Sequence, residues 1–262
     1  MPTGVPEKNI RETMVNPDET MDRLGRTLYV IQKRHGHRAA SDDVFLAWAA
    51  ARVCPGAGRV LDLGSGKGTV AMLLLRRLPQ CKVIGIEALE ASHDLAVRNS
   101  ILNGLENRYD PRLGDLRDPS VLVGEPPFDL ITGAPPFKPV GSGTLPRDAQ
   151  RAASRFELRG GAREYAEAAS THLAPHGTVV LLMDGLEQSR VRAVEALTSV
   201  SLFPHLTIAV KPRPGRPPVY RILAAGRKTG GTIEASLCMR LDVGSSWSQE
   251  YEAIRRDLDL PS

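Results

Sequence analysis

Short apolar runs alternate with segments of helical periodicity along most of the chain. The apolar runs have the length of buried strands, and the segments between them place apolar residues three and four positions apart, as amphipathic helices do. Such alternation predicts a mostly parallel sheet with helices on both faces, which is an α/β fold. The expected strands span residues 60–63, 82–87, 109–113, 128–133 and 178–184, and the expected helices span 68–78, 89–102, 162–173 and 186–197.

Two regions depart from this alternation. Near the C-terminus two strands, 202–210 and 219–225, follow one another across "KPRPGRPP", and this predicts an antiparallel hairpin at one edge of the sheet. Near the N-terminus Ser41-Asp42-Asp43 has the chemistry of a helix start, because a short polar side chain can cap a helix and acidic residues favour its first turn. The apolar spacing over 44–51 predicts that this helix continues to Pro55-Gly56.

Composition narrows the classes of function. The 262 residues suit one large domain, and 42% hydrophobic with 24% charged residues is ordinary for a water-soluble protein. The formal net charge of +4 is compatible with a nucleic-acid substrate without requiring one. The three scattered cysteines form no Cys-x-x-Cys pair, which argues against a zinc site or a disulfide framework. Residues 1–16 are polar and contain no apolar run of signal-peptide type, and no stretch of the chain approaches the length of a membrane span, so we expect a cytoplasmic protein.

The most informative stretch is "VLDLGSGKGTV", residues 60–70, where a buried strand meets a glycine-rich loop and a helix. A dinucleotide fingerprint needs Gly-x-Gly-x-x-Gly, but position 69 is Thr. A P-loop has the pattern Gly-x-x-x-x-Gly-Lys-Ser/Thr. Here Gly66-Lys67 is followed by Gly68 where Ser or Thr is needed, and position 61, five residues before Gly66, is Leu where glycine is needed. An acidic residue followed by Gly-x-Gly-x-Gly, the pattern of loops that bind S-adenosylmethionine, matches in full.

Two further carboxylates follow the next two expected strands. Glu87 ends the strand in "VIGIEAL", where it can accept hydrogen bonds from both hydroxyls of a ribose. Asp115 follows the third strand in "LGDLRD", where it can accept from an adenine amino group. Because open α/β sheets bind ligands at the carboxyl ends of their strands, these residues predict one nucleoside site together with the glycine loop.

These stretches, together with "GAPPF" at 133–137, resemble the class I S-adenosylmethionine-dependent methyltransferases. The resemblance covers roughly residues 25–228 and is greatest to the group that contains the bacterial tRNA adenine-N6 methyltransferases, which carries a methyltransferase small domain. It rests also on "GHRAASDDVFLAWAA", "SRFELRGGAREYAEAASTHLAPHG" and "PRPGRPPVYRILAAGRK". It implies a Rossmann-like methyltransferase fold, S-adenosyl-L-methionine as cofactor, no metal, and direct in-line transfer of the methyl group.

The resemblance also implies the residues of the site. In relatives the segment that corresponds to 36–50 covers the methionine end of the cofactor, and His37 stands where relatives often carry an aromatic residue. The expected cofactor-binding residues are Arg38, Asp42, Asp62, Gly64, Ser65, Gly66, Gly68, Glu87, Ala88, Asp115 and Leu116. The expected catalytic turn consists of Ala134, Pro135, Pro136 and Phe137.

Ala134 departs from the family pattern, in which an asparagine precedes Pro-Pro-Phe or Pro-Pro-Tyr and accepts hydrogen bonds from the target amino group. Three accounts of this departure stay open. The target is an amine that another acceptor orients, such as Glu157 or Asp129; or it is an oxygen, a ring nitrogen or a small molecule that needs no amide; or the protein binds the cofactor without transferring a methyl group.

Basic loops beside the expected turn favour RNA as the acceptor, with a small-molecule methyltransferase and a non-catalytic cofactor-binding subunit as alternatives. The basic residues suit the phosphates of RNA or an anionic metabolite, whereas 5% aromatic content argues against an extended base-stacking surface. The expected substrate-binding residues are Arg155, Glu157, Arg159, Lys211, Arg213 and Arg216.

The expected organisation has three parts. Residues 1–25 form a flexible tail, 26–228 form the methyltransferase domain, and 229–262 form a C-terminal extension that packs on the domain through Trp247, Tyr251 and Ile254. We expect a monomer or a homodimer, with no membrane partner.

Overall fold

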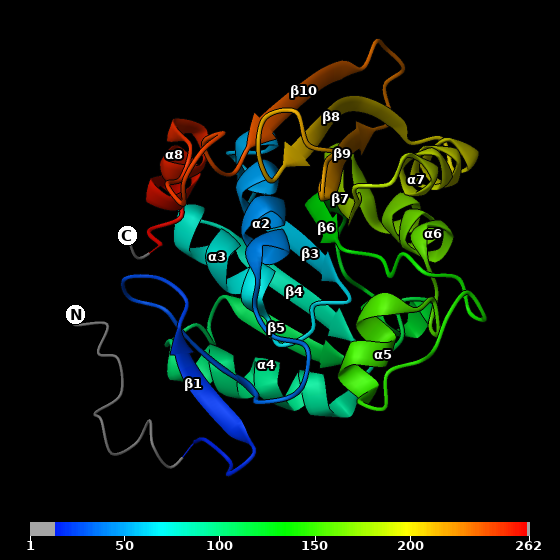
Figure 1. The fold of residues 1–262 in the computed structure, drawn as a ribbon. Helices are drawn as coiled ribbons and strands as arrows, with labels where there is room; N and C mark the ends of the chain where they lie inside the picture. Colours follow the sequence, from blue (N-terminus) through cyan, green and yellow to red (C-terminus); the bar gives the residue numbers. More distant parts are fainter. Residues whose placement is uncertain (1–13, 261–262) are drawn as a thin grey trace.

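An eight-stranded sheet forms the centre of the molecule (Figure 1). The computed structural model describes residues 14–260. The strand order is β10-β8-β9-β7-β6-β3-β4-β5; the strands from β7 to β5 run parallel, β9 runs antiparallel to β7 and β8, and β10 runs parallel to β8. The strands are β3 (Arg59–Leu63), β4 (Lys82–Glu87), β5 (Tyr109–Leu113), β6 (Phe128–Gly133), β7 (Leu173–Asp184), β8 (Phe203–Lys211), β9 (Tyr220–Gly226) and β10 (Ile233–Cys238).

Helices cover both faces of the sheet, as predicted (Figure 1). Alternate residues of the strands supply two cores: Val60 and Leu130 pack on the side of α2 and α3, whereas Leu61 and Ile131 pack on the side of α6 and α7. The fold class expected from the sequence is therefore confirmed. The helices are α2 (Ser41–Val53), α3 (Thr69–Arg77), α4 (Glu90–Leu102), the 3₁₀ turn η1 (Pro119–Leu122), α5 (Ala149–Arg155), α6 (Ala162–His172), α7 (Glu187–Ser199) and α8 (Gln249–Asp257).

The apolar pattern missed several elements. A separate antiparallel hairpin, β1 (Glu19–Arg23) with β2 (Tyr29–Lys33), lies partly in the segment expected to be a tail. Helix α5 lies in the long connection after β6, and β10 adds a strand outside the expected edge hairpin. Strand β1 is short and rich in polar residues, and β10 is short and mostly exposed, so neither leaves a continuous apolar run in the sequence.

The C-terminal segment packs against α2. The rings of Tyr251 and Phe45 lie 5.2 Å apart between centroids, and Trp247 meets Tyr251 edge-on at 4.9 Å. Ile254 is also buried in this core. Within residues 14–260, every helix is too short or too polar to cross a bilayer.

A buried ion pair joins the β1–β2 hairpin to α4. Glu19 is fully buried and accepts hydrogen bonds from both terminal nitrogens of Arg98, at 2.8 and 2.9 Å. Lys33 adds a contact at 3.2 Å, and the Asn16 amide donates at 2.9 Å. Chiefly because of the bonds from Arg98, the pKa of Glu19 falls to about 2. Glu19 therefore stays ionised in the fold and depends on its donors.

We expect Arg98→Met to lower the free energy of unfolding by about 2–3 kcal/mol, because it leaves a buried carboxylate with fewer donors. Urea unfolding monitored by circular dichroism measures this loss. The matched control is Arg163→Met, since Arg163 forms an exposed pair with Glu167 and its loss should change stability by less than about 0.5 kcal/mol. Equal effects of the two substitutions would contradict a structural role for the Glu19 pair.

Candidate functional site

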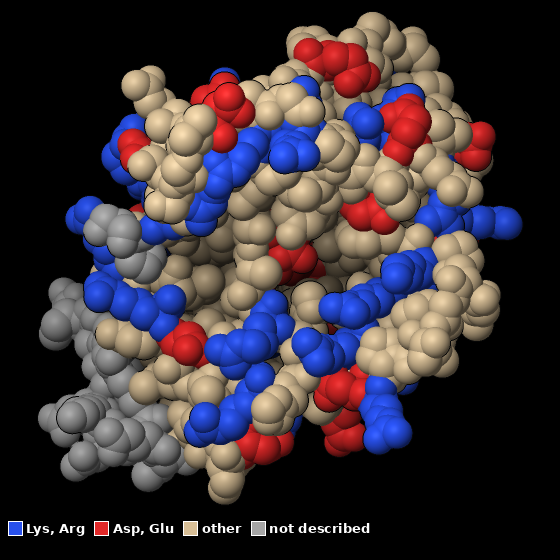
Figure 2. All heavy atoms as spheres, viewed as in Figure 1, with Lys and Arg blue, Asp and Glu red and all other residues tan. Residues whose placement is uncertain are grey.

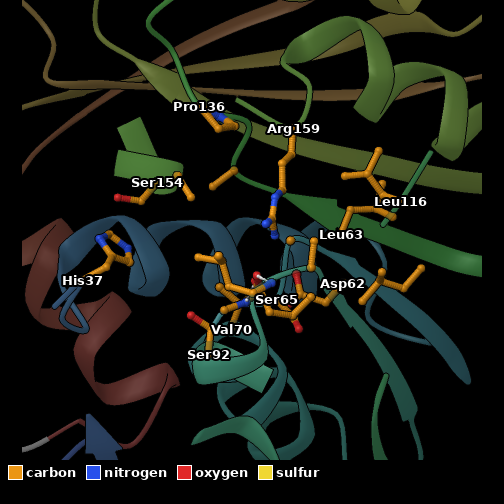
Figure 3. A pocket seen from close by; sticks show the side chains of 18 of the residues that line it. His37, Asp62, Leu63, Ser65, Val70, Ser92, Leu116, Pro136, Ser154 and Arg159 are labelled. Carbon is orange, nitrogen blue, oxygen red and sulfur yellow. Dashed lines mark hydrogen bonds between the residues drawn. The ribbon is translucent and has the colours of Figure 1, made fainter. Parts of the chain in front are cut away.

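A cavity of about 370 Å³ opens at the carboxyl ends of the parallel strands. Its walls come from the loops after β3, β4, β5 and β6, from the start of α2, and from α5 with the residues that follow it (Figure 3). Figure 2 shows this face of the molecule as a hollow with acidic side chains inside and Lys and Arg side chains around it. This is the position at which open α/β sheets bind ligands.

The glycine loop forms the floor of the cavity. Gly64 has φ 64°, and a Cβ on it would lie 2.2 Å from the hydroxyl of Tyr165, so a side chain is excluded by both backbone and space. Gly66 has φ 57° and directs its amide to Glu87. The loop therefore presents bare backbone to the cavity, where a ligand can approach closely.

Glu87, at the end of β4, joins the glycine loop to the next loop. One carboxylate oxygen accepts from the Gly66 amide at 2.8 Å, and the other accepts from the Leu89 amide at 2.7 Å. Burial raises the pKa of Glu87. Each oxygen keeps capacity for a second donor, so the carboxylate can also accept from the two hydroxyls of a ribose.

Asp115 lines the same cavity beyond the end of β5, next to Leu116. The Arg117 side chain donates to both of its oxygens, at 2.9 and 2.6 Å, and holds the pKa of this carboxyl below its usual range. Asp115 is thus a fixed, ionised acceptor at the side of the cavity away from His37. Leu116 and His37 stand on opposite sides of the cavity in Figure 3.

Two other carboxylates have an oxygen without a partner. Asp62 is almost fully buried; its Oδ1 accepts from the Thr132 hydroxyl at 2.7 Å, while its Oδ2 has no hydrogen bond. Burial raises the pKa of Asp62 to about 7; Asp43 and Glu87 add to this, and the bond from Thr132 opposes it. Asp42 lines the cavity with an unpartnered Oδ1, and burial raises its pKa as well.

The Ala134–Phe137 turn forms the opposite wall, and residues 134, 136 and 137 line the cavity. Arg192 of α7 donates to the Phe137 carbonyl at 2.6 Å and pairs with Glu157 at 2.9 Å. These contacts hold the turn from outside the cavity. Glu157 therefore lies behind the turn, and it does not face the position of an acceptor as expected from the sequence.

Several other residues expected at the site lie elsewhere. Arg38 pairs with Asp22 at 2.7 Å and lines a separate groove. Asp129 accepts from the amides of Gly58 and Arg59 at the amino end of β6, on the edge of the sheet opposite the cavity. The walls of the cavity also omit Gly68, Pro135, Lys211, Arg213 and Arg216.

The other expected residues do meet in the cavity, at the positions that sequence order along a parallel sheet implies. They are Asp42, Asp62, Gly64, Ser65, Gly66, Glu87, Ala88, Asp115, Leu116, Ala134, Pro136, Phe137, Arg155 and Arg159. Arg159 points into the cavity from the upper wall in Figure 3. Their assignment to individual atoms of a ligand stays a prediction.

The sequence did not indicate several further wall residues, among them Lys67, Tyr165, Gln150 and Tyr220. In the sequence, Lys67 is marked only by its place between two glycines of the loop. Tyr165 comes from α6, Gln150 from α5 and Tyr220 from β9, and no local pattern connects these elements with the glycine loop. The ring of Tyr165 lies between two loops, since a Cβ on Gly133 would be 2.7 Å from its Cδ1. Among the described residues its hydroxyl has no hydrogen-bond partner.

The residues of the cavity fit S-adenosylmethionine. Glu87 and Asp115 can hold a nucleoside, the glycine loop leaves room for the sulfur, and the unpartnered oxygens of Asp62 and Asp42 are acceptors for a cationic group. Within residues 14–260, His, Cys, Asp and Glu form no cluster of three or more that could hold a metal ion.

Comparisons with known proteins relate this chain to methyltransferases. The model of the methyltransferase small domain family matches residues 43–156. A tRNA1(Val) (adenine(37)-N6)-methyltransferase of Tolumonas auensis is 28% identical over 236 residues, which are 90% of this chain and 95% of that protein. Another of the same name, from Porphyromonas gingivalis, is 34% identical over 182 residues, 64% of this chain and 70% of that protein.

A solved structure agrees in fold. The crystal structure of a predicted O-methyltransferase from Agrobacterium tumefaciens superposes with a TM-score of 0.64 at 19% identity, covering 84% of this chain and 98% of that one. At this identity the likeness concerns the fold alone.

We expect Asp62→Asn to stabilise the protein more at pH 8 than at pH 5. The pKa of Asp62 rises from 3.8 to about 7 on folding, so its ionisation costs stability as pH rises through that range, up to about 4 kcal/mol. Asparagine has no such ionisation and can still accept from Thr132. Urea unfolding at the two pH values measures the difference between wild type and variant. The control is Asp257→Asn at an exposed position, whose effect on stability should be the same at both pH values. An effect of Asp62→Asn that is also the same at both pH values would contradict the raised pKa of Asp62.

Proposed function

This chain belongs to the methyltransferase small domain group of class I S-adenosylmethionine-dependent methyltransferases, and we propose that its acceptor is a base in RNA. Methyl transfer is its activity, and S-adenosylmethionine is its cofactor. Two tRNA adenine-N6 methyltransferases align with it, one of them over 95% of its own length, which supports an RNA acceptor. An RNA-modifying role also agrees with the cytoplasmic location that the sequence predicts.

The observation that carries this proposal is a group of arginines at the mouth of the cavity. Arg155 and Arg159 line the cavity beside the Ala134–Phe137 turn, and Arg151 lies one helical turn before Arg155 on α5. Among the described residues none of the three has an ion-pair partner. Unpaired guanidinium groups around a deep site suit the phosphates that flank a base inserted into it.

The walls of the cavity suit direct transfer. S-adenosylmethionine supplies a methyl group on a positively charged sulfur. Glu87 and Asp115 hold the nucleoside, and the Ala134–Phe137 turn positions the acceptor, with Phe137 as a stacking surface and the backbone carbonyls of the turn as hydrogen-bond acceptors. Since direct displacement needs no covalent intermediate with the protein, positioning accounts for much of the rate.

Ala134 removes one acceptor from this arrangement. A lost hydrogen bond of this kind costs about 1–3 kcal/mol, which corresponds to roughly ten- to a hundredfold in rate. Neither Glu157 nor Asp129 replaces it. Arg192 forms an ion pair with Glu157, and Asp129 lies at the amino end of β6, at the opposite end of the strand from the cavity. Ala134 itself therefore favours one alternative to an amino group, namely an acceptor oxygen or ring nitrogen on RNA or on a small molecule.

We expect transfer of tritium from labelled cofactor into bulk tRNA, and little transfer into a pool of small metabolites. Glu87→Ala should abolish most of this label by weakening cofactor binding. Arg155→Ala with Arg159→Ala should reduce it by weakening RNA binding, and this deficit should be largest at low salt, where contacts with phosphates contribute most. Exposed Arg52→Ala, on the side of α2, is the matched charge control. Label that enters metabolites while tRNA stays unlabelled would reverse the assignment of the acceptor.

Ala134→Asn tests the chemistry of the acceptor. If the acceptor is an amino group, the new amide can accept from it, and the rate should stay unchanged or rise by up to about tenfold. Single-turnover rates with the labelled RNA measure the effect, and Ala134→Leu, which fills the space without an acceptor, is the control. A clear loss of rate with Asn would argue against an amino group as the target.

A further inference from the structure

Lys67 is a buried ammonium group in the wall of the cofactor cavity. It is only 5% exposed, although it stands in the glycine loop between Gly66 and Gly68. Its backbone is held in place, since Asn99 of α4 donates to its carbonyl at 2.9 Å and also bonds both backbone groups of Ile31. Among the described residues its side chain has no hydrogen bond and no ion pair.

A buried, unpaired ammonium is costly. Removal of a charge from water costs several kcal/mol unless an opposite charge or hydrogen bonds replace the solvent. Burial accordingly lowers the pKa of Lys67, while Asp43 and Asp42 oppose this from the first turn of α2. Neither carboxylate lies within ion-pair distance of the ammonium, and Asp43 already accepts from the Ala40 amide at 3.2 Å. The cavity thus offers a cation that lacks a direct partner.

The position of Lys67 indicates which ligand group it meets. Glu87 and Asp115 mark the nucleoside side of the cavity, and the Ala134–Phe137 turn marks the acceptor side. The third part of the cavity extends from the glycine loop to His37 and the start of α2. It lies on the side of the cavity away from Leu116 (Figure 3). Asp42, with its unpartnered Oδ1, lies at the same end. Burial lowers the pKa of His37 and the charge of Lys67 lowers it further, so Lys67 also lies at this end, which combines one free cation with one free anion.

We propose that Lys67 binds the α-carboxylate of the methionine moiety of S-adenosylmethionine, and that Asp42 binds its α-ammonium group. The two side chains together recognise an amino-acid zwitterion. Lys67 is then a specificity residue, since it selects ligands that carry the carboxylate over those that end at the thioether. The proposal depends on the cofactor and not on the identity of the methyl acceptor.

Calorimetric titration with ligands of graded length tests this assignment without any catalytic readout. S-adenosylhomocysteine carries both charged groups, its decarboxylated analogue keeps only the ammonium, and 5′-methylthioadenosine has neither. Wild type should bind S-adenosylhomocysteine about ten- to a hundredfold more tightly than the decarboxylated analogue, as expected for a charge-assisted hydrogen bond.

In Lys67→Met this preference should fall to within about twofold, with the affinity for 5′-methylthioadenosine unchanged. Asp42→Asn should weaken binding of both ligands that carry the ammonium and leave 5′-methylthioadenosine unaffected. The crossed control is Glu87→Gln, which should weaken all three ligands by a similar factor because it acts on the ribose.

Three results would overturn the proposal. Wild type that binds S-adenosylhomocysteine and its decarboxylated analogue equally would show that no cation meets the carboxylate, and this result needs no variant. A loss of affinity in Lys67→Met that is equal for all three ligands would make Lys67 an internal counter-ion of Asp43. Absence of any binding would remove the cofactor site itself. Failure to methylate RNA would leave these binding data intact, so the two proposals fail separately.

Discussion

The site depends on one hydrogen bond that joins the loop after β3 to the end of β4, from the Gly66 amide to the Glu87 carboxylate at 2.8 Å. Strands β3 and β4 pair in parallel with Leu63 opposite Ile86, so the loops that follow them leave the sheet at the same edge. Glu87 then joins the two loops. Because Gly66 has a positive φ and no side chain, the loop can lie flat against that carboxylate and stay open above. The floor of the cofactor cavity is therefore a consequence of strand pairing.

The acceptor wall is held in a different way, by side chains from the other face of the sheet. The ring of Tyr165 lies between Gly64 and Gly133, which explains why both positions lack a side chain. Arg192 donates a hydrogen bond to the carbonyl of Phe137 from outside the cavity. The cofactor loop and the strand end that precedes the acceptor turn therefore both pack against the ring of Tyr165. A reaction that depends on alignment of donor and acceptor benefits from such rigid spacing.

Charge is divided between the depth and the rim of the cavity. Asp42, Asp62 and Glu87 lie deep, where burial raises the pKa of each, and Lys67 is buried beside them. The arginines of α5 and the residues after it stand at the mouth. A deep region of carboxylates with one ammonium suits a ligand with a cationic sulfur and an amino-acid end. A cationic rim suits an anionic acceptor that inserts only its reacting group into the cavity while the rest of it remains at the surface.

The sequence by itself determined the order of the strands from β3 to β9 and of most helices between them, and the identity of the cofactor loop, because apolar periodicity and glycine spacing are local properties. It also indicated Glu87 and Asp115, since strand ends along a parallel sheet meet at one edge. Only the tertiary structure decided that Tyr165 and Lys67 face the cavity and that Arg38, Glu157 and Asp129 do not. Arg38 and Glu157 are held by partners elsewhere in the chain, Asp22 and Arg192, and no local pattern encodes such pairs.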